Sequence, residues 1–177
     1  VSLMQRDRNT DSIYISYSTP KTPSRTFVFN LKTKEKKLVK EQIIPSGHNS
    51  NDYIVERLEC EGHDGRIIPI TITRKKTTKL DGNSNLLLYG YGSYGNSMWP
   101  SFSSVRLSLI NRDIIWATAH IRGGMERGMK WWKEGKLLNK KNTFEDYISC
   151  AKFLIDKKYT SKKKIIGMGG SAGGLLM

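Results

Sequence analysis

The alternation of apolar and polar residues divides the chain into two parts. Up to about residue 50 the pattern has a period of two, which is typical of strands with one buried face. The runs Ser12–Ser18, Arg25–Leu31 and Lys37–Lys40 predict short strands with turns between them. Such strands suit one blade of a β-propeller or part of a β-sandwich. The polar break Pro45–Asp52 ends this pattern, and we therefore expect an all-β part over residues 1–50.

The remainder, residues 51–177, begins with a hairpin and continues with alternating strands and helices. Gly62–Gly65 is a good turn sequence between two strand-like runs. From Leu86 onward, short apolar runs alternate with helical patterns, which predicts a mostly parallel sheet with flanking helices. Ligands of such sheets bind beyond the carboxyl ends of the strands, and glycine-rich segments follow two of these ends. The expected strands are Ile54–Cys60, Ile67–Thr73, Leu86–Tyr89, Ile114–Ala119 and Lys164–Met168, and the expected helices are Ser103–Asn111 and Thr143–Lys157, the latter capped by Asn142 or Thr143.

Composition narrows the classes of function. Hydrophobic residues make up 37% of the chain, which supports a packed core rather than disorder. Lys and Arg number 30 against 16 Asp and Glu, giving a formal net charge of +14. A nucleic-acid surface is one interpretation of this excess. The basic runs lack the interleaved aromatic side chains of a stacking platform, so we interpret them as solvated faces and expect no nucleic-acid partner.

The cysteines and the hydropathy pattern bear on compartment and cofactors. Cys60 and Cys150 are too few for a disulfide framework or a zinc site, so we expect both to be reduced and buried, with no metal or cofactor. No apolar run reaches the ~18 residues of a membrane helix, and we expect a cytoplasmic protein without a membrane contact. The chain begins with Val, as expected of a chain cut from a longer one or of an unusual start codon.

The segment Gly169–Gly173 (GGSAG) fits the pattern G-x-S-x-G after a predicted strand. In a nucleophile elbow of this pattern, the serine lies on a sharp, strained turn that exposes its hydroxyl, and the neighbouring residues must be small. Ser171 is therefore a candidate nucleophile, and the amide of Ala172 would point toward the oxygen of a tetrahedral intermediate. The alternative is a Gly/Ser-rich turn that only binds a phosphate or packs tightly.

A second glycine-rich segment, Tyr89–Gly95 (YGYGSYG), also fits the dinucleotide-binding pattern G-x-G-x-x-G. That function requires an acidic residue at the end of the next strand, whereas the strand here ends in Ala119 and His120. In α/β-hydrolases the corresponding loop supplies part of the oxyanion hole. A tyrosine hydroxyl can donate a hydrogen bond there as a backbone amide does.

Four segments together resemble one family. They are YGYGSYG at 89–95, HIRGG at 120–124, GKLLNKKNTF at 135–144 and GGSAGGLLM at 169–177. From about residue 53 onward the chain resembles the prolyl oligopeptidase family of serine peptidases, most closely oligopeptidase B. Residues 1–50 resemble the last blade of the family's β-propeller. The resemblance implies a partial α/β-hydrolase fold over residues 51–177 and a serine oligopeptidase activity on short peptides.

The resemblance also implies residue roles. Ser171 matches the nucleophile, Tyr91 the side-chain donor of the oxyanion hole, and Ala172 the backbone donor. Arg122 lies in the family's I-R-G-G segment, and we expect it to form a structural ion pair with Glu126 or Glu145.

Two departures from the family pattern change what we expect of the cleavage specificity and of the catalytic triad. Members that cleave after basic residues often carry carboxylates where this chain has Ser97–Phe102, which contains none. The triad order is Ser, then Asp or Glu, then His, and the sequence stops at Met177. His120 is the only histidine expected near Ser171, and we interpret it as structural.

We therefore expect this chain alone to be inactive unless another segment, such as a separately encoded C-terminal one, supplies Asp and His. A non-catalytic remnant or binding module is the alternative, and a nucleotide-binding α/β domain is a third hypothesis.

The expected incomplete fold also predicts poor solubility of the isolated 177-residue chain. It ends where the helix behind the elbow is expected to begin, which leaves one face and one edge of the sheet bare. We expect the isolated chain to elute as aggregate in size-exclusion chromatography. A monomer with a cooperative melting transition would contradict this prediction.

Overall fold

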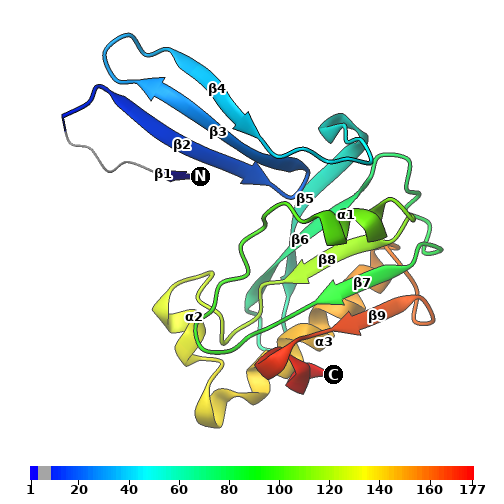
Figure 1. The fold of residues 1–177 in the computed structure, drawn as a ribbon. Coiled ribbons are helices and arrows are strands. Elements are labelled where there is room, and N and C mark those ends of the chain that lie inside the picture. Colours follow the sequence, from blue (N-terminus) through cyan, green and yellow to red (C-terminus); the bar gives the residue numbers. More distant parts are fainter. Residues whose placement is uncertain (4–8) are drawn as a thin grey trace.

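The first sheet is an antiparallel meander. The computed structural model describes residues 1–3 and 9–177 and divides them between two sheets (Figure 1). The first sheet has the order β1-β2-β3-β4, with the strands β1 Ser2–Leu3, β2 Ser12–Thr19, β3 Thr22–Asn30 and β4 Lys36–Glu41. The expected strands are confirmed. Every residue of β4 is exposed, so this sheet does not enclose a core of its own.

The second sheet is mixed, with the order β5-β6-β8-β7-β9. Its strands are β5 Tyr53–Glu61, β6 Ile67–Lys75, β7 Leu86–Tyr89, β8 Ile115–Ala119 and β9 Ile165–Met168. Strand β7 lies between β8 and β9 and runs parallel to both, whereas β6 is antiparallel to β5 and β8. The expectation of a mostly parallel sheet therefore holds only for β7, β8 and β9, because the turn at Gly62–Gly65 reverses the chain into a hairpin.

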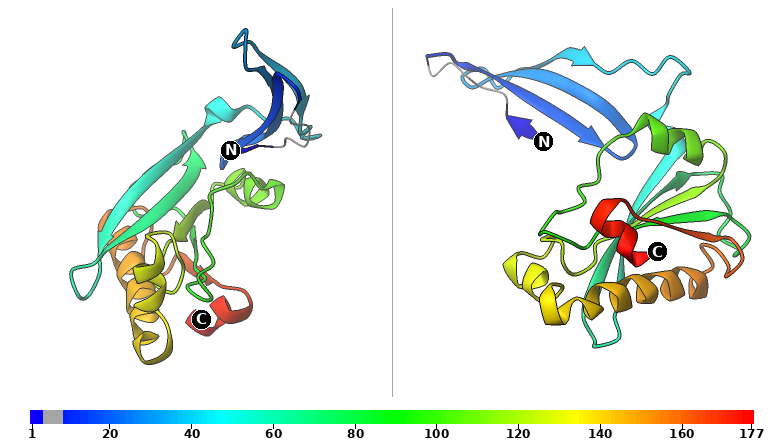
Figure 2. Two further views of the ribbon diagram at one scale, coloured as in Figure 1. Left: turned by 90° about the vertical axis from the view of Figure 1, so that its left-hand side faces the viewer. Right: turned by 60° about the horizontal axis from the view of Figure 1, so that its bottom comes forward.

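Helices cover both faces of the second sheet. Helix α3, Lys141–Asp156, lies along one face, and the short helix α1, Ser104–Ile110, lies on the other (Figure 2). Side chains of β8 alternate between the two faces: Ile115 and Ala117 join the core under α3, whereas Trp116 packs with α1. The larger core contains Ile70, Leu88 and Leu154, which are at most 1% exposed.

The start of α3 differs from the expectation. The helix begins at Lys141 with Lys140 as its N-cap residue, and no side chain caps it. The prediction that Asn142 or Thr143 caps this helix is therefore wrong. Tertiary contacts occupy both side chains instead: Asn142 Nδ2 donates to the carbonyl of Glu134 at 2.9 Å, and Thr143 Oγ1 donates to the carbonyl of Arg122 at 2.9 Å.

The segment between β8 and α3 carries two further short elements, α2 at Met129–Lys133 and a 3-10 turn at Leu137–Asn139. Of the helices in the described part of the chain, none is long and apolar enough to cross a membrane. Cys60 and Cys150 are buried and free in the core between β5 and α3, which confirms the expectation that both thiols are buried and unpaired.

The core packing under α3 predicts that alanine substitutions at two positions of this helix differ in how much they lower the free energy of unfolding. Replacing Leu154, which is fully buried, by Ala should lower the free energy of unfolding by ~2–5 kcal/mol through lost transfer energy and a cavity. Ile148 is 44% exposed, so Ile148→Ala is the matched control and should cost less than ~1 kcal/mol. Urea unfolding of the full chain measures both. Equal losses at the two positions would contradict this packing.

Candidate active site

Ser171 lies at a strained junction between a strand and a turn. Strand β9 ends at Met168, and a 3-10 turn, Ser171–Leu176, follows two glycines later. Ser171 has φ of 51°, in the left-handed region that residues with a Cβ rarely occupy, and its side chain is exposed. Strain of this kind persists only where the surroundings fix it, and it concentrates at functional positions. A serine on a strained turn beyond a parallel strand is the arrangement typical of α/β-hydrolases.

Two glycines explain the G-x-S-x-G spacing physically. A Cβ on Gly169 would lie 2.1 Å from the carbonyl oxygen of Gly173. A Cβ on Gly173 would lie 2.8 Å from the carbonyl oxygen of Gly90 and 3.1 Å from Tyr91 Cα. The turn therefore folds onto itself and onto the loop after β7, and only glycine fits at these two positions. Gly170 has open space around it, so its identity is not required by packing.

Tyr91 and Ser171 lie on loops that touch each other. Tyr91 follows β7, and its ring is one of the groups nearest to Gly173, two residues beyond Ser171. No described residue makes a hydrogen bond with the Tyr91 hydroxyl, which leaves this group able to donate. The amide of Gly173, the residue after Ala172, donates to the carbonyl of Gly170 within the turn at 2.8 Å. The structure thus brings together the elements that carry Ser171, Tyr91 and Ala172.

A cavity of about 800 Å³ opens beside Ser171. Ser171 and Ala172 form part of its wall, and Ser93, Tyr94 and Trp132 face them. Tyr91 is not among the described residues that line it. The described wall contains two lysines and no carboxylate, and its exposed surface is mainly apolar. Convergent polar groups in a mainly apolar cavity are typical of a small-molecule or peptide site.

None of the three histidines lines this cavity. His120 is 1% exposed, with Nε2 2.8 Å from Thr71 Oγ1 and Nδ1 3.6 Å from a carboxylate oxygen of Glu126. His48 packs at the junction of the two sheets, where its Nε2 lies 2.8 Å from the carbonyl of Lys21. His63 is exposed in the β5–β6 turn. The structural interpretation of His120 therefore agrees with its surroundings, and no imidazole of this chain reaches the Ser171 cavity.

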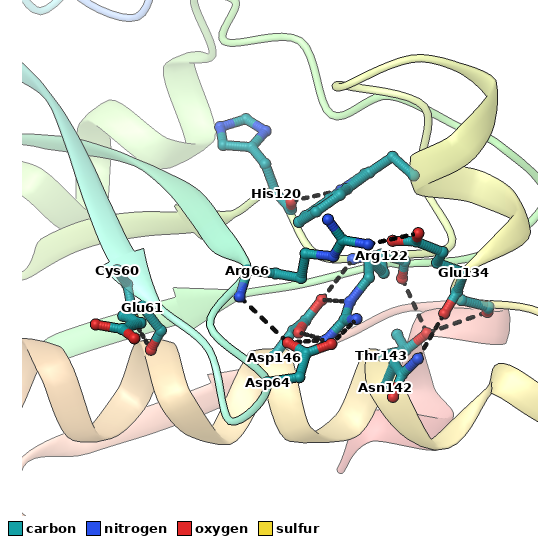
Figure 3. A network of polar contacts seen from close by, with 12 residues as sticks. Cys60, Glu61, Asp64, Arg66, His120, Arg122, Glu134, Asn142, Thr143 and Asp146 are labelled. Carbon is teal, nitrogen blue, oxygen red and sulfur yellow. Dashed lines mark hydrogen bonds and ion pairs between the residues drawn. The ribbon is translucent and has the colours of Figure 1, made fainter.

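Arg122 is the centre of a buried ion-pair network (Figure 3). Its guanidinium donates to both carboxylate oxygens of Asp146 on α3, at 2.8 and 2.5 Å. It also donates to both oxygens of Asp64 in the β5–β6 turn, at 2.6 and 3.2 Å. Burial alone lowers the pKa of Arg122, but the hydrogen bonds to Asp146 and Asp64 outweigh it and raise the pKa above its ordinary value. The network ties the end of β8 to the helix and the hairpin.

The predicted partners of Arg122 are wrong in identity, although the ion pair exists. Successive helix residues point about 100° apart, so Asp146 faces the sheet and Glu145 does not. Glu126 instead accepts a hydrogen bond from the amide of Met98 at 2.8 Å. Asp64 was missed because a turn sequence gives no sign of a contact 58 residues away.

Two side chains of α3 connect this network to the glycine loops. Thr143 Oγ1 donates to the carbonyl of Arg122, and its methyl group lies where a Cβ on Gly92 would come within 2.3 Å. Tyr147 donates from its hydroxyl to the carbonyl of Leu88 at 2.6 Å, and its ring lies directly under Gly90. Burial raises the pKa of Tyr147 to about 12, so the hydroxyl stays a donor at physiological pH. The same helix therefore supports both the ion pair and the Tyr91 loop.

Lys140 is a further residue at this site that the sequence pattern did not single out. It lies on the cavity wall, and its ammonium donates to the carbonyl of Gly92 at 2.6 Å and to Ser93 Oγ at 2.9 Å. In the sequence it belongs to the basic run Lys130–Lys141, which resembles a solvated surface. Its unfavourable place at the N-terminus of a helix became visible only in the structure, because the sequence pattern predicted that the helix begins at Thr143.

Comparisons with known proteins agree with this geometry. A family model described as the prolyl oligopeptidase family matches residues 100–177. Dipeptidyl aminopeptidase BI from Pseudoxanthomonas mexicana is 43% identical over 172 residues, which are 97% of this chain and 24% of that protein. Protease 2 from Moraxella lacunata is 39% identical over 175 residues, which are 99% of this chain and 25% of that protein.

Solved structures give the same result. Oligopeptidase B from Leishmania major matches with a TM-score of 0.88 at 37% identity, over 97% of this chain and 24% of that one. Prolyl oligopeptidase B from Galerina marginata matches with a TM-score of 0.92 at 32% identity, over 99% of this chain and 25% of that one. The chain belongs to the prolyl oligopeptidase family, and it spans about a quarter of the length of the curated relatives it matches.

The ion-pair network predicts a specific dependence of stability on pH. Partial burial tends to raise the pKa of Asp64, but the hydrogen bonds from Arg122 lower it below its ordinary value. A carboxylate with a lowered folded-state pKa contributes stability above its unfolded pKa of ~3.9 and loses it as the pH falls through the folded value. Asp64→Asn should therefore be less stable than wild type at pH 7, and the two unfolding free energies should converge below about pH 4.

Glu61→Gln, an exposed carboxylate of the same hairpin without an ion pair among the described residues, is the control for this experiment. Urea unfolding as a function of pH measures all three proteins. A constant difference between Asp64→Asn and wild type at every pH would contradict the role of the carboxylate charge.

Proposed function

We propose that the protein is a serine-type oligopeptidase with Ser171 as its nucleophile. The observation that carries this proposal is the φ of 51° at Ser171, held at the end of β9 with the side chain exposed on a cavity of about 800 Å³. Membership of the prolyl oligopeptidase family supports the same reaction class. The alternatives are a non-catalytic module and a nucleotide-binding domain, and neither accounts for a strained serine at this position.

The proposed reaction is acyl transfer in two steps. Ser171 Oγ attacks the carbonyl carbon of the scissile peptide, and the resulting oxyanion accepts hydrogen bonds from the Ala172 amide and the Tyr91 hydroxyl. The amine leaves with a proton, and water then hydrolyses the acyl-enzyme to release the acid and free Ser171. The serine proton needs a base within ~2.6–3.2 Å. We propose that the histidine and its orienting carboxylate lie outside these 177 residues, within the length of the relatives that this chain does not span. Nothing in the comparisons supports a separately encoded segment as their source.

The proposed organisation follows from the two sheets. We assign residues 1–50 to the end of a β-propeller and residues 51–177 to part of an α/β-hydrolase peptidase domain. The break between β4 and β5 and the match to oligopeptidase structures over nearly the whole chain support this division. A propeller beside the active site would restrict entry to short peptides. Two buried free thiols suit a reducing compartment such as the cytoplasm.

The cavity wall bears on the substrate. Lys136 and Lys140 line it and no described carboxylate does, so a basic substrate side chain would find no counter-ion there. This agrees with the absence of carboxylates in Ser97–Phe102. Relatives are named prolyl endopeptidase and dipeptidyl aminopeptidase, and we propose short peptides with an uncharged residue at the cleavage position as substrates.

An active-site probe tests the proposal. A fluorophosphonate should label the full chain that contains these residues, and Ser171→Ala should abolish the labelling, whereas the exposed Ser108→Ala on α1 should not change it. Tyr91→Phe should fold normally and lower kcat by ~10²–10³-fold, the usual loss for one oxyanion donor. Labelling that persists in Ser171→Ala, or a wild-type full chain that neither reacts with the probe nor cleaves peptides, would overturn the proposal.

A further inference from the structure

Lys140 is in an unfavourable place for a lysine, unless the loop beside it needs the charge. It is the N-cap residue of α3, where the positive end of the helix dipole disfavours a cation. Its side chain is half-buried, and this burial lowers the pKa of Lys140. No carboxylate of the described residues forms an ion pair with it. Its closest polar partners, the Gly92 carbonyl and Ser93 Oγ, belong to the loop that carries Tyr91.

The Gly92 carbonyl is held from two sides. Lys140 Nζ donates to it at 2.6 Å, and on the other side it lies where a Cβ on Gly123 would come within 2.0 Å. Gly92 itself has φ of 62°, and it lacks the Cβ that would restrict its backbone. The orientation of its carbonyl therefore depends on the contacts that the carbonyl makes. The far end of the loop is fixed separately, because the amide of Gly95 donates to the carbonyl of Gly123 at 2.9 Å. Lys140 is thus the only described side chain that hydrogen-bonds the backbone between Tyr91 and Gly95.

We propose that Lys140 is a positioning residue of the active site, whose ammonium fixes the Gly92 peptide and thereby keeps the Tyr91 hydroxyl in place for the oxyanion. The inference rests on the proposed function of Ser171 and Tyr91. The Gly92 carbonyl belongs to the peptide between Gly92 and Ser93, so a shift of this peptide moves the Gly92 backbone and, through it, the adjoining Tyr91. An oxyanion donor is effective only when it is held in advance at the position where the charge develops. Lys140 touches neither the serine nor the substrate in this role.

The kinetic test compares two adjacent lysines. Lys140→Met in the full chain should lower kcat by about 10-fold or more and change KM by less than ~2-fold, because the lost interaction acts in the transition state. Lys141→Met removes the same charge from the next residue, which is exposed, and should leave both parameters unchanged. If Lys140→Met does not fold, Lys140→Gln replaces it, since the amide keeps a donor without the charge. A rise in KM confined to peptides that carry a carboxylate would overturn the inference in favour of direct substrate binding.

A double-mutant cycle separates positioning from a general loss of structure. If Lys140 acts through the Tyr91 hydroxyl, then Lys140→Met should change kcat by less than ~2-fold in the Tyr91→Phe background. Losses that multiply across the two sites would overturn the inference. The failure of the proposed function itself is distinguishable, because then the wild-type full chain would not react with the fluorophosphonate and Tyr91→Phe would have no effect.

Discussion

The placement of helix α3 and of the β5–β6 hairpin depends on the buried guanidinium of Arg122. The Arg122 side chain is 1% exposed, so its charge must be neutralised and its N–H donors must be hydrogen-bonded. Breaking a buried ion pair of this kind typically lowers the free energy of unfolding by ~3–5 kcal/mol. Two carboxylates from different elements meet this need, Asp146 from α3 and Asp64 from the β5–β6 turn. Their geometry fixes where the helix and the hairpin lie relative to the end of β8.

The glycine contacts carry this constraint to the catalytic region. The carbonyl of Arg122 accepts from Thr143, and the next residue, Gly123, lies against the carbonyl of Gly92. The loop that contains Gly92 then packs through Tyr91 against Gly173, which closes the turn around Ser171. The approaches of Gly123 to the Gly92 carbonyl and of Gly173 to the Gly90 carbonyl are too close for a Cβ, so little slack remains between the ion pair and the serine. Interiors that are packed in this way transmit displacement rather than absorb it.

The features that sequence reasoning obtained are local ones. Strands such as β2 and β7 follow from apolar period and length, and the elbow at Ser171 follows from small residues after a strand. The partners of Arg122 were not obtainable in this way, because Asp64 lies 58 residues away and Asp146 differs from Glu145 only by its direction on a helix. Lys140 was hidden for a similar reason, since one lysine in a basic run looks like the others until the loop beside it is placed. The cap of α3 was wrong because the helix begins at Lys141, which places Asn142 and Thr143 within its first turn, where their side chains donate to carbonyl oxygens of other segments.

The tip of the β5–β6 hairpin has a practical consequence for engineering the protein. Exposed hairpin tips are ordinarily the preferred places for epitope tags, fluorescent-protein insertions and circular permutation. Here the tip contains Asp64, so an insertion at Gly62–Gly65 would displace a ligand of the Arg122 guanidinium. The turn between β3 and β4 is also exposed, and its only described side-chain contacts are with its own backbone and with the neighbouring Asp11 and Glu35. A tag is therefore better tolerated at Lys32–Lys34 than at the tip that looks equally free in sequence.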